Sequence, residues 1–154
     1  MTVFSTSRHV PYGAGLVLGI VADVASYPEF MPLVKRAVVR NRQDLSDHRS
    51  AFDAEVAIAY ERLGVLEMLY SQVTVDLGQG TVTAVSDEGA VKSLNAVWKV
   101  SEEAGGTCTV DLTIDYVMRS RALQFLLAGL IDMVARRIMT AFEERAARLY
   151  APSS

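Results

Sequence analysis

Cysteine and histidine are scarce in this sequence, which has one cysteine and two histidines among 154 residues. The single cysteine, Cys108, cannot form an internal disulfide, as is typical of proteins from a reducing compartment. It lies in the alternating run TCTVDLTIDYV, which predicts a buried strand cysteine rather than a nucleophile. His9 and His48 lie in different predicted strands without a cysteine or carboxylate at ligand spacing, so we expect no metal site.

Long hydrophobic runs are also missing, although 51% of the residues are hydrophobic. The longest runs, 14–22 and 122–131, are far shorter than the roughly 20 residues that span a bilayer. The N-terminus lacks a basic start followed by an apolar segment, so the sequence predicts no signal peptide. We therefore expect a cytoplasmic protein.

Motifs for common enzyme reactions are absent as well. The sequence has no Gly-x-Ser-x-Gly, P-loop or dinucleotide-binding glycine pattern, and its net charge of −3 does not favour nucleic acid. Asp53 and Glu55 lie two residues apart on one strand face. A solvated outer face is the simpler interpretation, and an acid/base pair lining a cavity is the alternative. We therefore assign no catalytic residues.

The chain does contain a long amphipathic segment at 120–150, in which apolar residues recur at the three- and four-residue steps of one helix face. The part before it is rich in strand patterns. We expect a first strand at 3–10 and a helix at 14–24, which Pro28 and Pro32 prevent from continuing beyond a short turn.

Six further strands are predicted between clusters of turn residues. They cover 33–42, 49–60, 65–77, 81–86, 94–102 and 107–118. Short connections favour an antiparallel meander, so we predict an α+β fold and one domain over 1–154. A twisted sheet of about seven strands with one apolar face curls around its cover, and the long C-terminal helix is the obvious cover.

The run DVASYPEFMP at 23–32 contains Tyr27, Pro28, Phe30 and Pro32 at fixed spacing. Together with LNAVWKV at 94–100, AFEERA at 141–146 and the element order, it resembles the START-like (helix-grip, SRPBCC) superfamily. The resemblance is to the branch that holds coenzyme Q-binding proteins, ribosome association toxins and polyketide cyclase-like proteins. It implies a strongly curved antiparallel sheet that grips the long helix.

The resemblance implies three functions. The first is non-enzymatic binding or chaperoning of a coenzyme Q-like isoprenoid quinone or another lipid between sheet and helix, in support of respiration. No cofactor is required, and ubiquinone or lipid is the implied ligand. The second is binding to the large ribosomal subunit, which would block subunit association. The third is a polyketide cyclase or aromatase reaction, for which we find no convincing acid/base pair.

Apolar side chains on the helix and on the strands are candidates for lining the cavity. They are Phe52, Val56, Met68, Tyr70, Trp98, Tyr116, Leu123, Leu127, Leu130, Ile131 and Val134. For the helix residues, an ordinary packed core is the simpler interpretation. If Trp98 is buried, its indole N–H needs a partner, which is either a ligand carbonyl or a backbone oxygen.

Two surfaces are unusually apolar, the hairpin tip at 63–66 and the helix at 14–22. Exposed apolar patches mark contacts with partners or membranes. A lipid carrier must reach its ligand in a bilayer, so peripheral contact at the inner membrane is one interpretation. A homodimer explains the patches equally well. Basic residues concentrate only around the last helix and are the candidates for binding ribosomal RNA. They are Arg119, Arg121, Arg136, Arg137, Arg145 and Arg148.

Overall fold

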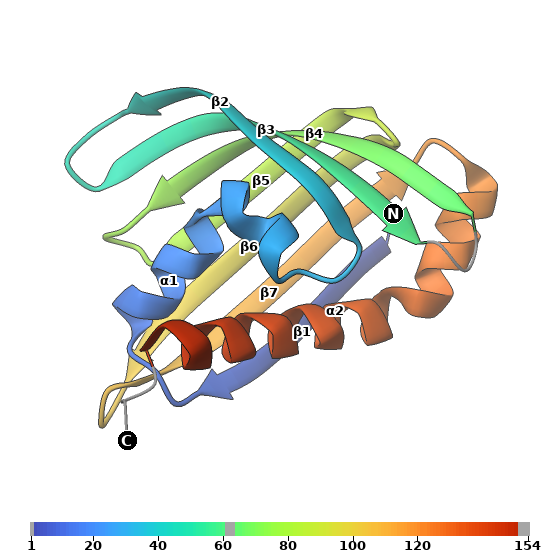
Figure 1. Ribbon diagram of the computed structural model, residues 1–154. Coiled ribbons are helices and arrows are strands. Elements are labelled where there is room, and N and C mark those ends of the chain that lie inside the picture. The colour runs from blue at the N-terminus through green and yellow to red at the C-terminus, as the bar shows by residue number, and fades with distance from the viewer. Residues whose placement is uncertain (1, 61–63, 151–154) are drawn as a thin grey trace.

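The computed structural model describes residues 2–60 and 64–150 as a sheet that wraps around helices (Figure 1). The elements in chain order are β1 (Thr2–Val10), α1 (Ala14–Ala22), the 3₁₀ helix η1 (Val24–Glu29), β2 (Val34–Asp44), β3 (Arg49–Tyr60), β4 (Val65–Asp76), β5 (Thr81–Gly89), β6 (Val91–Glu103), β7 (Thr107–Met118) and α2 (Arg121–Tyr150). This is the predicted order of one strand, a helical pair, six strands and a long helix.

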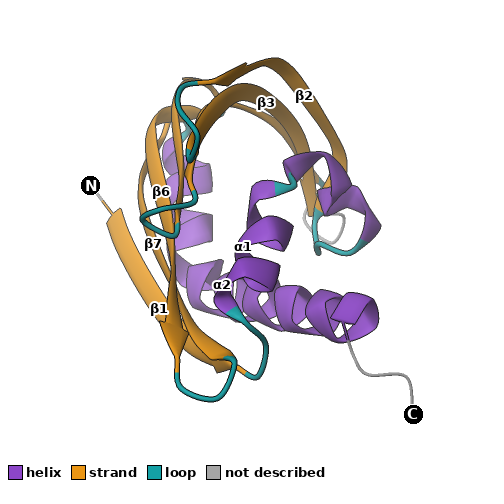
Figure 2. Cartoon of the chain, turned by 90° about the vertical axis from the view of Figure 1, so that its left-hand side faces the viewer, coloured by secondary structure: helices purple, strands orange, loops and turns teal. Residues whose placement is uncertain are grey.

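The seven strands form one antiparallel sheet in the order β1-β7-β6-β5-β4-β3-β2. Six strands follow one another as a meander, and β1 joins the far edge by pairing with β7. Figure 2 shows the sheet curled around α1, with α2 lying along its open side. The predicted α+β class and the helix-grip arrangement are confirmed.

The strand bounds are best predicted where alternation is regular. β3 and β7 have the predicted bounds. β5 and β6 are longer than predicted and meet in a tight turn after Gly89. Gly89 has a φ of 68°, a conformation that glycine adopts without steric cost. Near it, an irregularity between Tyr70 and Gln72 interrupts the pairing of β4 with β5, so simple alternation fails there.

The apolar helix α1 is buried inside the curled sheet. Its inner side consists of Val17, Leu18, Ile20 and Val21. Its outward positions include Gly15 and Gly19, which present little side-chain surface to solvent. Leu16 is the exposed large apolar side chain of α1, and the rest of the apolar surface predicted at 14–22 is mostly core.

The two halves of α2 differ in burial. The helix begins after Ser120, whose hydroxyl accepts a hydrogen bond from the backbone N–H of Leu123 at 3.2 Å. This bond satisfies one of the otherwise unpaired N–H groups of the first turn. The fully buried residues of α2 lie from the middle of the helix onward, at Ala135, Met139, Phe142 and Ala146. Figure 1 shows that the first turns, at the orange end, are inclined to the rest of the helix.

Candidate ligand cavity

A cavity of about 280 Å³ lies between the sheet and the N-terminal half of α2. This volume is near the lower end of the range for small-molecule sites. The wall from α2 consists of Leu123, Leu126, Leu127, Leu130, Ile131, Val134 and Ile138. Of the 23 residues that line the cavity, only Val91 and Tyr116 are fully buried. The other wall residues are partly exposed, and the cavity shows that the N-terminal half of α2 covers the sheet without filling the gap.

Seven of the eleven residues predicted to line a cavity border this one. They are Met68, Tyr116, Leu123, Leu127, Leu130, Ile131 and Val134. The five on the helix share one face because they are three or four residues apart. Their role in binding a ligand remains a prediction.

Phe52, Val56 and Trp98 lie outside the cavity, and their predicted position is corrected here. Phe52 and Trp98 belong to the packed core, and Val56 packs against that core. The same core contains residues of α1 and Val24 of η1, the two helical segments that lie within the curled sheet (Figure 2). Face alternation identified Phe52, Val56 and Trp98 as inward-facing, but it does not tell which half of the inner face is filled.

Tyr70 lies on the outer face of the sheet, so its predicted place in the cavity is also corrected. The buried residues of β4 are Ser71, Val73 and Val75, and alternation places Tyr70 opposite them. The odd-numbered Leu69 lines the cavity. The polar residues at 72, 74 and 76 already indicated this phase in the sequence.

The other wall residues were not predicted from the sequence to line the cavity. They are Met31, Pro32, Leu33, Val34, Ile58, Tyr60, Val65, Glu67, Leu69, Ala90, Val91, Leu94, Ile114, Leu126, Met118 and Ile138. Ile58 and Tyr60 share a face with Phe52, and Ile114 and Met118 share one with Tyr116, so alternation could have found these four. The segment 31–34 is an irregular connection with no periodic signal.

The family motif forms a cluster of rings against α2. Tyr27 and Phe30 both pack edge to face on Phe142, with centroid distances of 5.6 Å and 5.3 Å. The Tyr27 hydroxyl donates a hydrogen bond to the main-chain carbonyl of Val21, the penultimate residue of α1. Pro28 lies within η1. Tyr27 and Phe30 therefore hold η1 against α2, Tyr27 also joins it to α1, and Pro32 contributes to the cavity wall.

The cavity wall contains few polar groups. Only three of its side chains carry an oxygen or nitrogen atom, at Tyr60, Glu67 and Tyr116. Among the described residues, the Tyr116 hydroxyl is the one buried side-chain polar atom without a hydrogen-bond partner. Burial also raises the pKa of this hydroxyl. The site can therefore hold an apolar molecule and offers one buried polar contact.

The carboxylates considered as an acid/base pair lie away from the cavity. Asp53 accepts a hydrogen bond from the side chain of Asn41 at 2.8 Å, and Glu55 lies 3.7 Å from Arg40. Both partners are on β2, and both carboxylates are on the outer face together with Tyr70. The solvated outer face is thus the correct interpretation.

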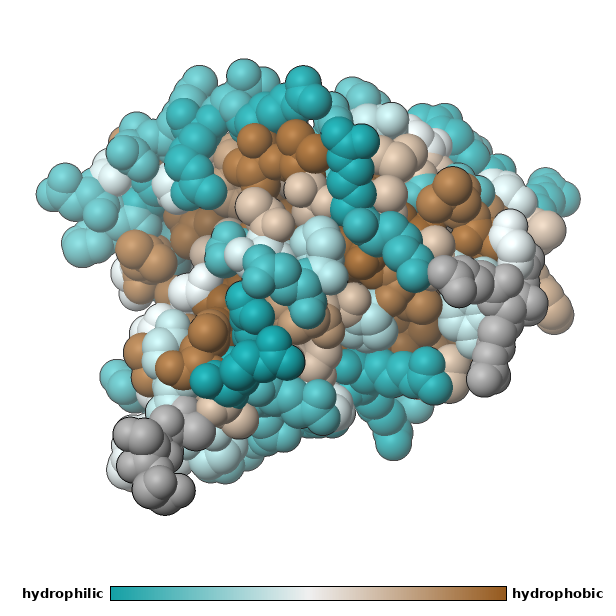
Figure 3. Space-filling model, in the orientation of Figure 1, coloured by the Kyte–Doolittle hydropathy of each residue, from teal (hydrophilic) through white to brown (hydrophobic). Residues whose placement is uncertain are grey.

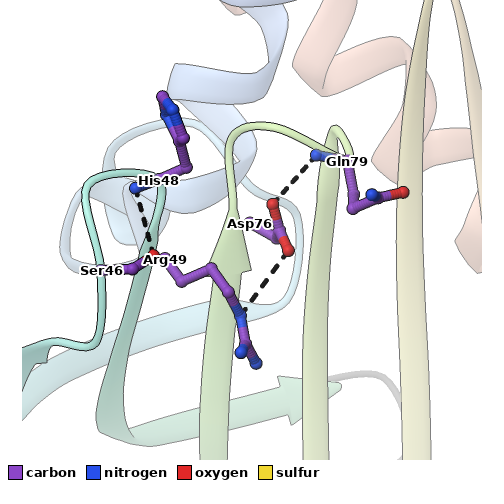
Figure 4. A network of polar contacts seen from close by, with 5 residues as sticks. All are labelled: Ser46, His48, Arg49, Asp76 and Gln79. Carbon is purple, nitrogen blue, oxygen red and sulfur yellow. Dashed lines mark hydrogen bonds and ion pairs between the residues drawn. The ribbon is translucent and has the colours of Figure 1, made fainter.

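His48 lies in the turn between β2 and β3, where its imidazole is directed away from Asp76 (Figure 4). Asp76 instead pairs with Arg49 at 3.6 Å and accepts a hydrogen bond from the backbone N–H of Gln79 at 2.9 Å. These contacts join two neighbouring turns. Across residues 2–60 and 64–150, no group of three or more histidine, cysteine, aspartate or glutamate residues is arranged to hold a metal.

Apolar side chains are exposed beside the cavity. Phe125, on the first turns of α2, is 85% exposed, and Leu66, at the start of β4, is 68% exposed. In the view of Figure 3, apolar surface is visible above α2, next to the hairpin between β3 and β4. Leu63 of the predicted apolar tip lies outside the described residues. No helix within the described part of the chain is long and apolar enough to cross a membrane.

The basic residues near α2 are partly engaged in contacts within the chain. Arg136 pairs with Asp132 at 3.1 Å, and Arg145 pairs with Glu29 at 3.4 Å. The Arg119 guanidinium donates hydrogen bonds to the main-chain carbonyls of residues 87 and 89, at 2.6 Å and 3.0 Å. Part of the positive charge around α2 is therefore neutralised by ion pairs. The Arg119 guanidinium instead binds the end of β5.

A curled seven-stranded sheet that grips a long C-terminal helix over a cavity defines a START-like helix-grip protein. A solved START superfamily protein from Mycobacterium smegmatis shares this fold, with a TM-score of 0.79 and 14% identity over 96% of this chain and 98% of that chain. Residues 10–143 match the family model described as polyketide cyclase / dehydrase and lipid transport. The chain belongs to this family, which confirms the resemblance found in the sequence.

Curated relatives come from two groups. The chain is 30% identical to the mitochondrial coenzyme Q-binding protein COQ10 homolog B of Xenopus laevis, over 94% of this chain and 61% of that protein's length. It is 28% identical to the ribosome association toxin RatA of Pseudomonas aeruginosa, over 97% of this chain and 98% of that protein. The family of the chain is thus established, but these two relatives are named for different functions.

Proposed function

We propose that this protein binds an isoprenoid quinone or a similar lipid in the cavity under α2 and carries or chaperones it without chemical change. The cavity itself is the observation that supports the proposal most directly. It is bounded almost wholly by apolar side chains, which suits a ligand with few polar groups. The similarity to a coenzyme Q-binding protein supports a quinone in particular.

The composition of the wall supports binding rather than catalysis. Proton transfer requires an acid or base within hydrogen-bond reach of the reacting group. The candidate pair Asp53 and Glu55 lies on the opposite face of the sheet, and both histidines are exposed and lie outside the wall. A cyclase reaction in this cavity therefore has few groups to draw on.

The exposed side chains of Phe125 and Leu66 support uptake from a membrane surface. Each lies next to wall residues in sequence: Phe125 precedes Leu126, and Leu66 lies between Val65 and Glu67. An apolar ligand that crosses water without cover is strongly disfavoured. Apolar groups beside the cavity would let the ligand pass from the bilayer to the protein with little exposure.

The proposal is tested by extracting lipid from purified protein, identifying it by native mass spectrometry, and titrating delipidated protein with a short-tailed ubiquinone analogue. The variant Leu127→Trp places a bulky indole ring in the cavity and should weaken binding of the analogue at least tenfold. The control Leu149→Trp alters an exposed residue at the far end of the same helix and should bind as the parent does. Absence of bound lipid together with no binding of the analogue would refute the proposal.

A second candidate function is binding to the large ribosomal subunit. It is favoured by the similarity to a ribosome association toxin along almost the full length of both chains. The contacts that occupy Arg136 and Arg145 count against a strongly basic docking surface. Sedimentation of ribosomes through sucrose at low salt tests this candidate function, because a protein that binds the large subunit must travel with the large-subunit fraction. Absence from that fraction would refute it.

A further inference from the structure

The Tyr116 side chain occupies an unusual position in the cavity wall. It projects from the concave face of β7, on the same face as Ile114 and Met118. Its side chain is 1% exposed, which makes it one of the largest fully buried side chains in the described part of the chain. Its hydroxyl nevertheless has no hydrogen-bond partner in the protein.

An unpaired buried hydroxyl is unfavourable, because the group loses its hydrogen bonds to water and gains none in return. Phenylalanine would keep the same ring in the same wall and avoid this cost. The presence of tyrosine therefore requires a partner from outside the chain, or a water molecule.

Water is a poor partner at this position. A buried water molecule needs two to four polar neighbours. The wall offers side-chain oxygens only at Tyr60, Glu67 and Tyr116. Tyr60 and Glu67 lie on β3 and β4, which β5 and β6 separate from β7 in the sheet. A ligand oxygen needs only the Tyr116 hydroxyl, while the remainder of the ligand contacts apolar side chains.

We infer that the Tyr116 hydroxyl donates a hydrogen bond to a carbonyl oxygen of the bound ligand, and that this contact selects carbonyl-bearing lipids over hydrocarbons. The inference rests on the proposed function and adds to it the polar group that the ligand must carry. A quinone ring and a lipid ester both supply such a carbonyl. Tyr116 is the residue suited to contact it, because it belongs to the cavity wall and its hydroxyl has no partner within the described part of the chain.

The Tyr116 hydroxyl carries a proton and can therefore act as a hydrogen-bond donor. Burial raises the pKa of Tyr116, so the proton stays on the oxygen at neutral pH. A carbonyl has no proton to give, so the pair is matched only in this direction.

The test compares Tyr116→Phe with the control Tyr70→Phe, which makes the same change on the outer face. Calorimetric titrations use three probes: a short-tailed benzoquinone, an aromatic hydrocarbon with the same tail, and a fatty-acid methyl ester. For Tyr116→Phe we expect about two- to tenfold weaker binding of a carbonyl probe and unchanged binding of the hydrocarbon. Tyr70→Phe should change neither. The probe that responds identifies the carbonyl as that of a quinone or of an ester.

Two results would overturn the inference while leaving the proposed function standing. One is binding of every probe to Tyr116→Phe with parental affinity. The other is a clear loss of stability in unliganded Tyr116→Phe, which would show that the hydroxyl has a structural partner; we expect a stability equal to or higher than that of the parent. If the parent protein binds none of the three probes, the proposed function fails and the inference fails with it.

Discussion

The indole ring of Trp98 packs edge to face on the phenyl ring of Phe142, with their centroids 4.9 Å apart. Trp98 comes from β6 and Phe142 from the C-terminal half of α2, so the contact closes the space between sheet and helix at this level. Nearer the N-terminus of α2, no pair of aromatic rings among the cavity-lining residues joins the sheet to the helix, and the cavity lies at that level. This contact therefore belongs to the filled half of the interior.

Replacing Phe142 with alanine should lower the free energy of unfolding by about 3–5 kcal/mol, because a fully buried ring that contacts three other aromatic rings leaves a void. Phe125→Ala is the matched control on the same helix, and this exposed residue should change stability by less than about 0.5 kcal/mol. Urea unfolding followed by circular dichroism measures both. Equal effects would show that the two ends of α2 are packed alike.

A larger side chain should be tolerated in the empty half of the interior and not in the filled half. Leu127→Trp directs its added volume into the cavity, so we expect a loss of less than about 1.5 kcal/mol in unfolding free energy. Met139→Trp enlarges a buried residue in the packed half and should cost about 1–3 kcal/mol. Thermal unfolding of the two variants makes the comparison. A more severe loss for Leu127→Trp would mean that side chains fill the cavity in solution.

Contact with membranes should depend on the N-terminal end of α2. Phe125→Asp places a charge on the most exposed large apolar side chain described in this structure and should reduce binding to phospholipid vesicles severalfold. Leu149→Asp makes a similar change at the other end of the helix and should have little effect. Vesicle flotation measures binding. The idea fails if both variants float with vesicles as the parent does, or if the parent does not bind them.

Stability should fall at alkaline pH. Burial, and next the charge of Asp23, raise the pKa of Tyr27 above its ordinary value of 10.0, and burial raises the pKa values of Cys108 and Tyr116. The unfolded chain then loses these protons at a lower pH than the folded chain does. Their combined contribution to stability is complete below about pH 8, where the unfolded cysteine begins to lose its proton, and declines as the pH rises further.

The variant Tyr27→Phe isolates one of these groups. It loses the hydrogen bond to Val21, so at pH 7 its unfolding free energy should be lower than that of the parent by about 1 kcal/mol. The difference should narrow above pH 10, because only the parent carries the titrating hydroxyl at this position. Urea unfolding at pH 7, 9 and 10.5 measures it, and a constant difference across this range would contradict the assigned cause.

Local patterns were enough for most elements of this fold. β7 has strict alternation between apolar and polar residues, and its predicted bounds match. α2 was predicted from its three- and four-residue period. Where the local pattern is broken, one prediction failed: Tyr70 was predicted to line the cavity, although the buried residues Val73 and Val75 place it on the outer face of β4. Large apolar residues do not by themselves identify the buried face, because sheets also carry them on the outside.

The cavity-lining residues were likewise predicted only in part. Leu123, Leu127 and Leu130 were placed on one helix face from the sequence, and they border the cavity. Trp98 was placed there too, but it lies in the core. Both sets face inward, so period alone treats them alike. Their difference depends on α1 and η1, which fill one half of the interior.

The sequence by itself determined the element types, their order along the chain, the family and most of the inward-facing residues, because these follow from periodicity, turn residues and the run of Tyr27, Pro28, Phe30 and Pro32. Only the tertiary structure decided where the interior is empty and that the Tyr116 hydroxyl has no partner inside it. Both depend on how the sheet curves around three helical segments. That curvature is the sum of strand twist and packing over the whole sheet, and no local segment of the chain encodes it.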